Sequence, residues 1–151
     1  MKKFLVVAVA LLVGYVALSS QYGLGVNEAP RPVAEEQGTE QSDAVIARAF
    51  SRHESNVQVA GHGVVTKLLP DDNKGSRHQK FLLKLSSGHR LLVAHNIDLA
   101  PRIDNLQEGD AVQFYGEYEW NEKGGVVHWT HRDPRGSHVG GWLQHHGQKY
   151  Q

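Results

Sequence analysis

The spacing of apolar and polar residues changes along the chain and predicts three kinds of segment. After Lys2 and Lys3, residues 4–18 are almost all apolar, which is the layout of the n-region and h-region of an export signal. This run is shorter than the roughly 20 residues that span a bilayer. No further charge occurs before Glu28, so a cleaved signal peptide and a signal anchor both fit. Residues 1–26 are therefore predicted to be one or the other.

The export signal also sets the expected location of the rest of the chain. We expect it to be periplasmic, either soluble after signal cleavage or anchored to the inner membrane. Contact with the membrane is expected only through residues 1–26, and only if they are retained.

A linker and a short helix are predicted next. Residues 27–42 hold two prolines and four glutamates and almost no large apolar side chain, which is typical of a disordered linker. Ser42 is a suitable N-cap, with Asp43 in the first turn, for a helix over residues 43–52. The apolar face of this helix consists of Val45, Ile46, Ala49 and Phe50.

From Val57 onward the apolar period becomes two, which predicts strands. The first strand is long, and Gly61 and Gly63 suit a sharp bend in it. A hairpin follows, in which a three-residue loop at 86–88 keeps the apolar faces of both strands together. This register places Phe81 opposite Val93 and Leu83 opposite Leu91.

A second hairpin is predicted after a short helix or turn within residues 96–109. Its first strand begins after Gly109 and Asp110, and its second covers residues 126–130. A four-residue loop at 121–124 sets Tyr118 opposite Val127 and Glu117 opposite His128. Trp120 and Trp129 fall on the side expected to be core.

The order of these elements predicts the fold class. A long bent strand, a hairpin, a short connection and a second hairpin are the order of an OB-fold. We therefore predict an all-β domain over residues 43–151 with a short N-terminal helix, built as a small five-stranded OB-fold-like barrel. Residues 135–151 show neither the helical nor the strand period of apolar residues. They are predicted to be a Gly/His-rich extension folded over the barrel. A small β-sandwich is the alternative.

Composition limits the function. The 151 residues allow one compact domain with an appendage, and 16 basic residues balance 16 acidic ones, which argues against a mainly electrostatic nucleic-acid binder. The chain has no cysteine, which excludes disulfides, thiol chemistry and lipidated cysteine. Ten histidines, five of them in the last 24 residues, are the main sign of chemistry.

Several long strings resemble a family of short exported bacterial proteins that is catalogued only as a domain of unknown function. The resemblance covers roughly residues 57–151 and rests on residues 69–81, 94–102 and 109–134 and on Gly141-Trp142. Such a family implies no activity and no catalytic residues.

A ligand-binding face is predicted on the outer side of the first hairpin and the loop before it. OB barrels commonly bind ligands there, and this region is basic. Tyr115 is also predicted to bind the ligand, because its ring would stack on a base. The predicted ligand-binding residues are Lys74, Arg77, His78, Lys80, Lys84, Arg90 and Tyr115.

A histidine-rich cluster near the fifth strand predicts a metal site. Imidazoles and a carboxylate suit a first-row metal, and a turn at Asp133-Pro134 would bring them back toward the strand. The predicted ligands are His128, His131, Asp133 and His138. A divalent metal is the cofactor they suggest, although their spacing matches no zinc signature and solvated histidines are the plainer interpretation.

Two further sites are weighed beside it. Glu117 and Glu119 share an outer face, and His128 opposite Glu117 would form a general base oriented by a carboxylate, so Glu117 and His128 are predicted as catalytic residues. Ordinary exposed sheet surface is the alternative. The loop 71–77, with adjacent Asp71 and Asp72, would hold a divalent ion, but a solvated turn explains it as well.

The sequence thus favours an exported binding module for an anionic ligand such as an oligonucleotide, a nucleotide or an acidic glycan. The alternatives are a metal-dependent hydrolase of the phosphodiesterase or nuclease type and a structural or partner-binding envelope protein.

Overall fold

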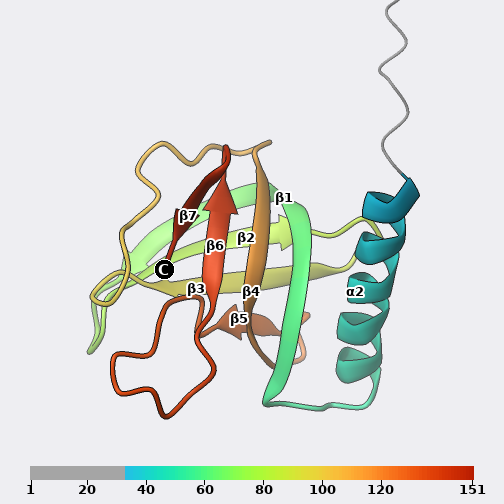
Figure 1. Ribbon diagram of the computed structural model, residues 1–151, viewed down its shortest axis with the longest axis horizontal. Coiled ribbons are helices and arrows are strands. Elements are labelled where there is room, and N and C mark those ends of the chain that lie inside the picture. The colour runs from blue at the N-terminus through green and yellow to red at the C-terminus, as the bar shows by residue number, and fades with distance from the viewer. Residues whose placement is uncertain (1–32) are drawn as a thin grey trace, which may run out of the picture. The chain divides into compact units, whose positions relative to one another are not determined.

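The computed structural model describes residues 33–151, in which one helix is followed by seven strands (Figure 1). The bounds are α2 Val33–Ser51, β1 Val57–Asp72, β2 His78–Lys84, β3 Arg90–Asn96, β4 Ala111–Glu119, β5 Val126–His128, β6 Trp142–His145 and β7 Gln148–Tyr150. The predicted all-β class with a short N-terminal helix is confirmed. The predicted export segment 1–26 lies outside the described residues, and within the described part no helix is long and apolar enough to span a membrane.

Five of the strands close into a ring. The pairing order is β1-β2-β3-β5-β4, and β4 pairs again with β1. The pairing of β3 with β5 is parallel and the other pairings in the ring are antiparallel. Figure 1 shows the long β1 bending around this ring. The sandwich alternative is wrong, because the strands form one continuous sheet.

Both predicted hairpin registers are confirmed. Phe81 pairs with Val93 and Leu83 with Leu91. In the second hairpin Tyr118 pairs with Val127, and Glu117 with His128. Loop length fixes these registers, since a slip of one residue would turn every buried side chain toward solvent.

Gly61 has a packing role that the sequence did not predict. The ladder between β1 and β4 runs without interruption from Val57 to Val64, whereas the irregularities of β1 lie after Val65 and after Leu69. A Cβ at Gly61 would lie 2.7 Å from the Phe114 ring. Gly61 is therefore required by close packing.

Helix α2 begins at Val33, so part of the segment predicted as linker is helical. The residue before it in the sequence is Pro32, and proline is a residue type favoured at helix starts. Ile46 and Ala49 are buried in the core that the helix shares with the ring. This face packs against β1, and tertiary packing of this kind is the main source of stability for helices in proteins.

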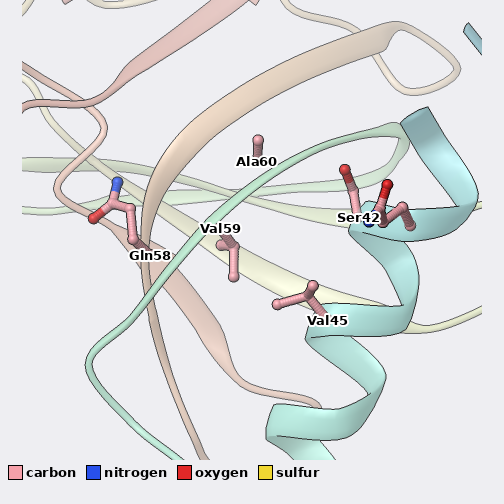
Figure 2. A pocket seen from close by; sticks show the side chains of 6 residues that line it. Ser42, Val45, Gln58, Val59 and Ala60 are labelled. Atoms are coloured by element: carbon pink, nitrogen blue, oxygen red, sulfur yellow. The ribbon is translucent and has the colours of Figure 1, made fainter.

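A small pocket of about 210 Å³ lies between α2 and β1 (Figure 2). It is lined from α2 by Gln41, Ser42 and Val45, and from β1 by Gln58, Val59 and Ala60. No charged residue is among these lining residues, so the pocket offers packing space and no reactive group.

Asp43 lies in the interior of α2, so the prediction of Ser42 as N-cap and Asp43 in the first turn is wrong. Asp43 instead ties the helix to the ring. The side chain is 3 % exposed, and Oδ2 accepts hydrogen bonds from the Ser86 hydroxyl at 2.7 Å and the Ser87 amide at 2.8 Å. These bonds join the helix to the β2–β3 loop.

We expect Asp43→Ala to lower the free energy of unfolding by about 1–2 kcal/mol, because two hydrogen bonds to a carboxylate are lost. The stabilisation that Asp43 gives the wild type is limited, because its Oδ1 is buried without a hydrogen-bond partner in the described part of the chain. Urea unfolding measures the effect, and Gln41→Ala, at an exposed position of the same helix, is the control. Equal stability of the two variants would contradict the role.

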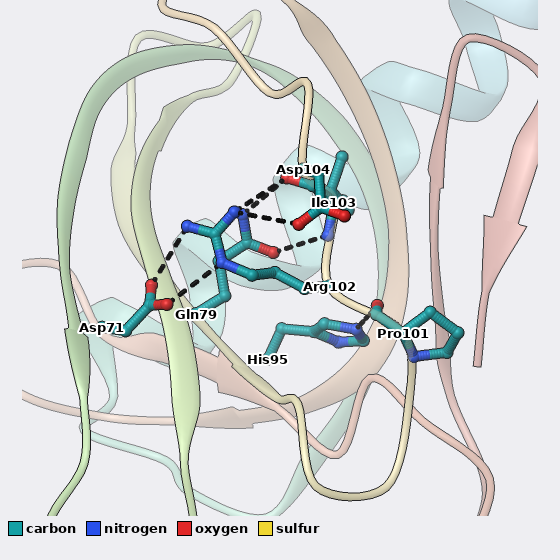
Figure 3. A network of polar contacts seen from close by, with 7 residues as sticks. All are labelled: Asp71, Gln79, His95, Pro101, Arg102, Ile103 and Asp104. Atoms are coloured by element: carbon teal, nitrogen blue, oxygen red, sulfur yellow. Dashed lines mark hydrogen bonds and ion pairs between the residues drawn. The ribbon is translucent and has the colours of Figure 1, made fainter.

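The connection between β3 and β4 contains turns and no helix. The Gln79 side chain binds this connection through both backbone groups of Ile103. Oε1 accepts a hydrogen bond from the Ile103 amide, and Nε2 donates one to the Ile103 carbonyl, each at 2.9 Å. Arg102 adds an ion pair with Asp71 at 3.0 Å. Figure 3 shows these contacts together with His95 beside Pro101.

His95 belongs to the core and does not simply end a strand. It is fully buried. Nε2 donates to the Pro101 carbonyl at 3.1 Å, which leaves Nδ1 to accept from the Thr130 hydroxyl at 2.8 Å. Burial lowers the pKa of His95 to about 4, so the ring is neutral at pH 7.

The expectation that residues 135–151 lack strands is wrong. β6 pairs with β4 and β7 pairs with β6, so the ring sheet continues outward on one side. His146 and Gly147 connect them with φ of 47° and 77°, as a tight hairpin turn requires. Leu143 is fully buried against the core, which confirms that the segment packs on the ring.

Candidate functional site

Two carboxylates and an imidazole meet on the outer face of β4 and β5. Glu117 and Glu119 are two residues apart on β4, so they share one face. His128 on β5 pairs with Glu117. Its Nε2 lies 3.5 Å from Glu117 Oε1 and 3.8 Å from Glu119 Oε1. The two predicted catalytic residues, Glu117 and His128, are thus brought together.

His128 Nε2 is buried and has no hydrogen-bond partner among the described residues. The carboxylate oxygens are at or beyond the outer limit of hydrogen-bond length. Burial lowers the pKa of His128, against the opposite effect of the two carboxylates. The neutral imidazole therefore faces two anionic groups without a hydrogen bond to either.

A second histidine completes the cluster from the loop after β5. His138 Nε2 lies 2.9 Å from Glu117 Oε2, and Nδ1 lies 2.8 Å from the Val139 carbonyl oxygen. Both partners only accept, so both ring nitrogens donate and the ring is an imidazolium. The bond to the Val139 carbonyl, and then the bond to Glu117, raise the pKa of His138. The imidazole stacks on Trp129 with 3.8 Å between centroids and 8° between planes.

Asp133 shapes the loop that carries His138 and does not point at the cluster. Its Oδ2 accepts from the amides of Ser137 and His138 at 2.7 and 2.8 Å, and Oδ1 accepts from the Arg135 amide. These hydrogen bonds, of which the one from the Arg135 amide contributes most, lower the pKa of Asp133 to about 2. The carboxylate is thus occupied by the turn that brings the chain back to β4.

The chain leaves β5 directly after His128. Trp129 has φ of 52°, a left-handed conformation, so its side chain is partly exposed and the core position predicted for it is wrong. Trp120 is partly buried against the core, as predicted.

A pocket of about 190 Å³ opens beside the cluster on the outer face of β2, β3 and β5. Three imidazoles and an indole surround it; the lining residues are His78, Ala94, Asn96, Leu99, His128, Trp129 and His131. His131 Nδ1 donates to the Arg132 carbonyl at 2.7 Å, so Nε2 is the ring nitrogen not used by this contact. This volume is below the usual 300–1,000 Å³ of small-molecule sites, so the pocket fits one ring or group of a larger ligand.

The predicted metal set therefore separates in space. His128 and His138 both contact Glu117, whereas His131 lines the pocket and Asp133 holds its own loop. The group of potential ligands in the described residues that includes His128 is completed by Glu117 and Glu119. The sequence placed Glu119 on the face of Glu117, but neither glutamate was predicted as a metal ligand.

The predicted basic face is present along β2 and β3. Lys84 pairs with Arg90 at one end, and His78 pairs with Asn96 at the pocket end. Four of the predicted cations form no ion pair within the described residues: Lys74, Lys80, Lys84 and Arg90. Arg77 is different, because its Nε is 2.7 Å from Asp98 Oδ1.

Tyr115 lies apart from this face, and the carboxylates of the loop 71–77 already form hydrogen bonds within the protein. Tyr115, on β4, is paired across the strands with Trp142 of β6, with ring centroids 6.3 Å apart. In the loop 71–77, Asp71 binds Arg102 and Asp72 accepts the Lys74 amide. The interpretation of this loop as a hydrogen-bonded turn fits these contacts.

A further group, Asp110, His145 and His146, was missed because the C-terminal strands were missed. His145 is 3 % exposed, and its Nε2 lies 2.8 Å from Asp110 Oδ2. The His145 and His146 rings stack at 3.8 Å. The contact between His145 and Asp110 joins β6 to the residue before β4. A structural role therefore explains why these side chains lie together.

Comparison with known proteins adds one match. A family model described as "Protein of unknown function (DUF3465)" matches residues 33–151. No curated protein matches the chain. The matched range contains α2 and all seven strands, and thus every site residue considered above.

Proposed function

Because the chain belongs to this family of proteins of unknown function, which supplies no activity, we propose a function from the site itself: an exported OB-type module that binds an extended anionic polymer. The ligand class that the face fits best is a single-stranded oligonucleotide. The ring order, with its parallel β3–β5 pairing, supports the OB-type assignment. The charged n-region and apolar run of residues 2–18 support export.

One observation carries the binding proposal. Lys84 and Arg90, which form no ion pair within the described residues, lie at one end of the β2–β3 face, and the imidazole-rich pocket lies at the other. β2 has seven residues, so at about 3.3 Å per residue these ends are roughly 20 Å apart. Lys80 lies between them, opposite Ala94 of the pocket. A ligand that contacts both ends must be long, and Lys80, Lys84 and Arg90 favour one that carries negative charge.

The aromatic group at the pocket favours nucleic acid. One face of Trp129 is stacked by His138, and the residue also lines the pocket. Bases stack on aromatic side chains irrespective of sequence. The balanced net charge of the chain is compatible with this function because Lys80, Lys84 and Arg90 lie together on the outer face of β2 and β3.

We expect a fluorescently labelled single-stranded oligonucleotide to bind at low salt, as measured by anisotropy. Lys84→Ala/Arg90→Ala should weaken binding about tenfold and reduce the dependence of log K on log salt by roughly 1.4, since each phosphate contact contributes about 0.7. Arg48→Ala/Arg52→Ala removes the same charge from exposed positions on α2 and just after it, and is the matched control.

The competing results are distinct. Absence of binding at low salt, or equal weakening by the two double variants, would overturn the proposed face. Binding of an acidic glycan without binding of the oligonucleotide would overturn the nucleic-acid assignment.

A further inference from the structure

We propose that Glu117, Glu119 and His128 form a binding site for one divalent first-row metal ion such as Zn²⁺ or Mn²⁺. The proposal does not depend on which ligand the basic face binds, and the site differs from the metal set predicted from sequence in every residue except His128. It lies on the outer face of β4 and β5, at the edge of the pocket that His128 lines.

Interatomic distances are the first support. A ligand atom of each residue lies within 4.8 Å of the others. Ligands about 2.1 Å from a tetrahedral ion are separated by roughly 3.4 Å. The separations of His128 Nε2 from the two carboxylate oxygens, 3.5 and 3.8 Å, are close to that value and too long for strong hydrogen bonds.

The unsatisfied nitrogen is the second support. His128 Nε2 is buried and has no hydrogen-bond partner among the described residues, and such atoms are uncommon in native proteins unless an ion or water completes them. The carboxylates of Glu117 and Glu119 both lie near it. An ion bound to Nε2 would accept the lone pair and neutralise both carboxylates.

Charge balance is the third support. Within the described residues, no lysine or arginine forms an ion pair with Glu117 or Glu119. The His138 imidazolium binds Glu117 through Oε2 at 2.9 Å, which leaves Oε1 facing His128. This is the role of an outer-shell group that orients a ligating carboxylate. Glu119 has no lysine or arginine partner in the same part of the chain either, so neither carboxylate is paired with a permanently charged cation.

The donor set indicates the class of metal. Two carboxylates and one imidazole suit Zn²⁺, Mn²⁺ or Fe²⁺ better than a soft ion, which prefers sulfur, or Ca²⁺, which prefers oxygen alone. The three side chains are 14, 32 and 34 % exposed for Glu117, Glu119 and His128. They leave a side of the ion open to water or to a ligand in the pocket.

The test uses the full chain without a histidine tag, after treatment with a chelator. Titration calorimetry with Zn²⁺ alone, and separately with Mn²⁺ alone, measures stoichiometry and affinity. We expect one equivalent of at least one of these ions to bind and to raise the Tm. Glu119→Gln keeps the shape of the side chain but removes its charge, and should weaken binding at least tenfold. His128→Gln should do the same.

His146→Gln is the matched control, since it removes an exposed imidazole from the second group of potential ligands. Unchanged affinity in this variant, with loss in Glu119→Gln, supports the site. Two results would overturn it: no binding of either ion by the wild type, or loss of binding in His146→Gln with none in Glu119→Gln. Urea unfolding of each variant without metal separates lost binding from lost folding.

Discussion

Replacing Phe114 by alanine is expected to lower the free energy of unfolding by about 3–5 kcal/mol, the usual cost of removing a buried aromatic ring. Phe114 is fully buried on β4, between Gly61 of β1 and Leu143 of β6 in the strand registers. The ring covers Gly61, where a Cβ would approach it to 2.7 Å. Because Gly61 has no side chain, β1 cannot fill the cavity that the alanine variant leaves.

A double-mutant cycle tests this explanation. Gly61→Ala alone should destabilise the protein by about 1–3 kcal/mol through overpacking. The same change in the Phe114→Ala background should cost less, because the new methyl group enters the vacated space. Leu68→Ala, at a β1 residue 41 % exposed, should change stability by no more than about 0.5 kcal/mol. Additivity of the two core changes would show that they do not share this space.

Acidification is expected to destabilise the protein between pH 6.5 and about 4 because of His95. Burial lowers the pKa of His95 from 6.5 to about 4, with smaller contributions from the charges of His131 and His78. The unfolded chain therefore takes up a proton in this range that the folded chain does not. Stability is fully present above pH 6.5 and falls as the pH decreases toward 4. At about 1.4 kcal/mol per pKa unit, the loss is roughly 3 kcal/mol.

His95→Gln isolates this contribution from the other titrating groups. At pH 7 the variant should be less stable than the wild type, because the bonds to Thr130 and Pro101 are disturbed. The difference should shrink by roughly 3 kcal/mol between pH 7 and pH 4, as measured by urea unfolding. His53→Gln, at an exposed position, should keep the wild-type profile. A difference that is constant with pH, or an NMR titration of the wild-type His95 ring near pH 6.5, would contradict the prediction.

The strand registers were predictable because each depends on local information. Side chains alternate across a strand, and loop length sets which residues face each other. These two facts are enough to pair Glu117 with His128 from the sequence alone. Glu119, on the same face, follows from the same parity.

The C-terminal hairpin was not predictable by the same means. Its strands contain few apolar side chains, so the alternation of apolar and polar residues that indicates a strand is weak. In addition, β7 has only three residues. Its pairing with β4 depends on a surface made by residues about 30 positions earlier in the chain. The dipeptide His146-Gly147, which suits a tight turn, was the available signal.

The chain by itself thus determined the class of fold, the paired hairpins and the basic face, since these follow from side-chain alternation and loop parity. Only the tertiary structure decided which histidines act together. His95 is buried in the core. His138 instead contacts Glu117, because Asp133 accepts hydrogen bonds that turn the loop after β5 back on itself. Such contacts join segments distant in sequence, and no local pattern records the path of the chain between them.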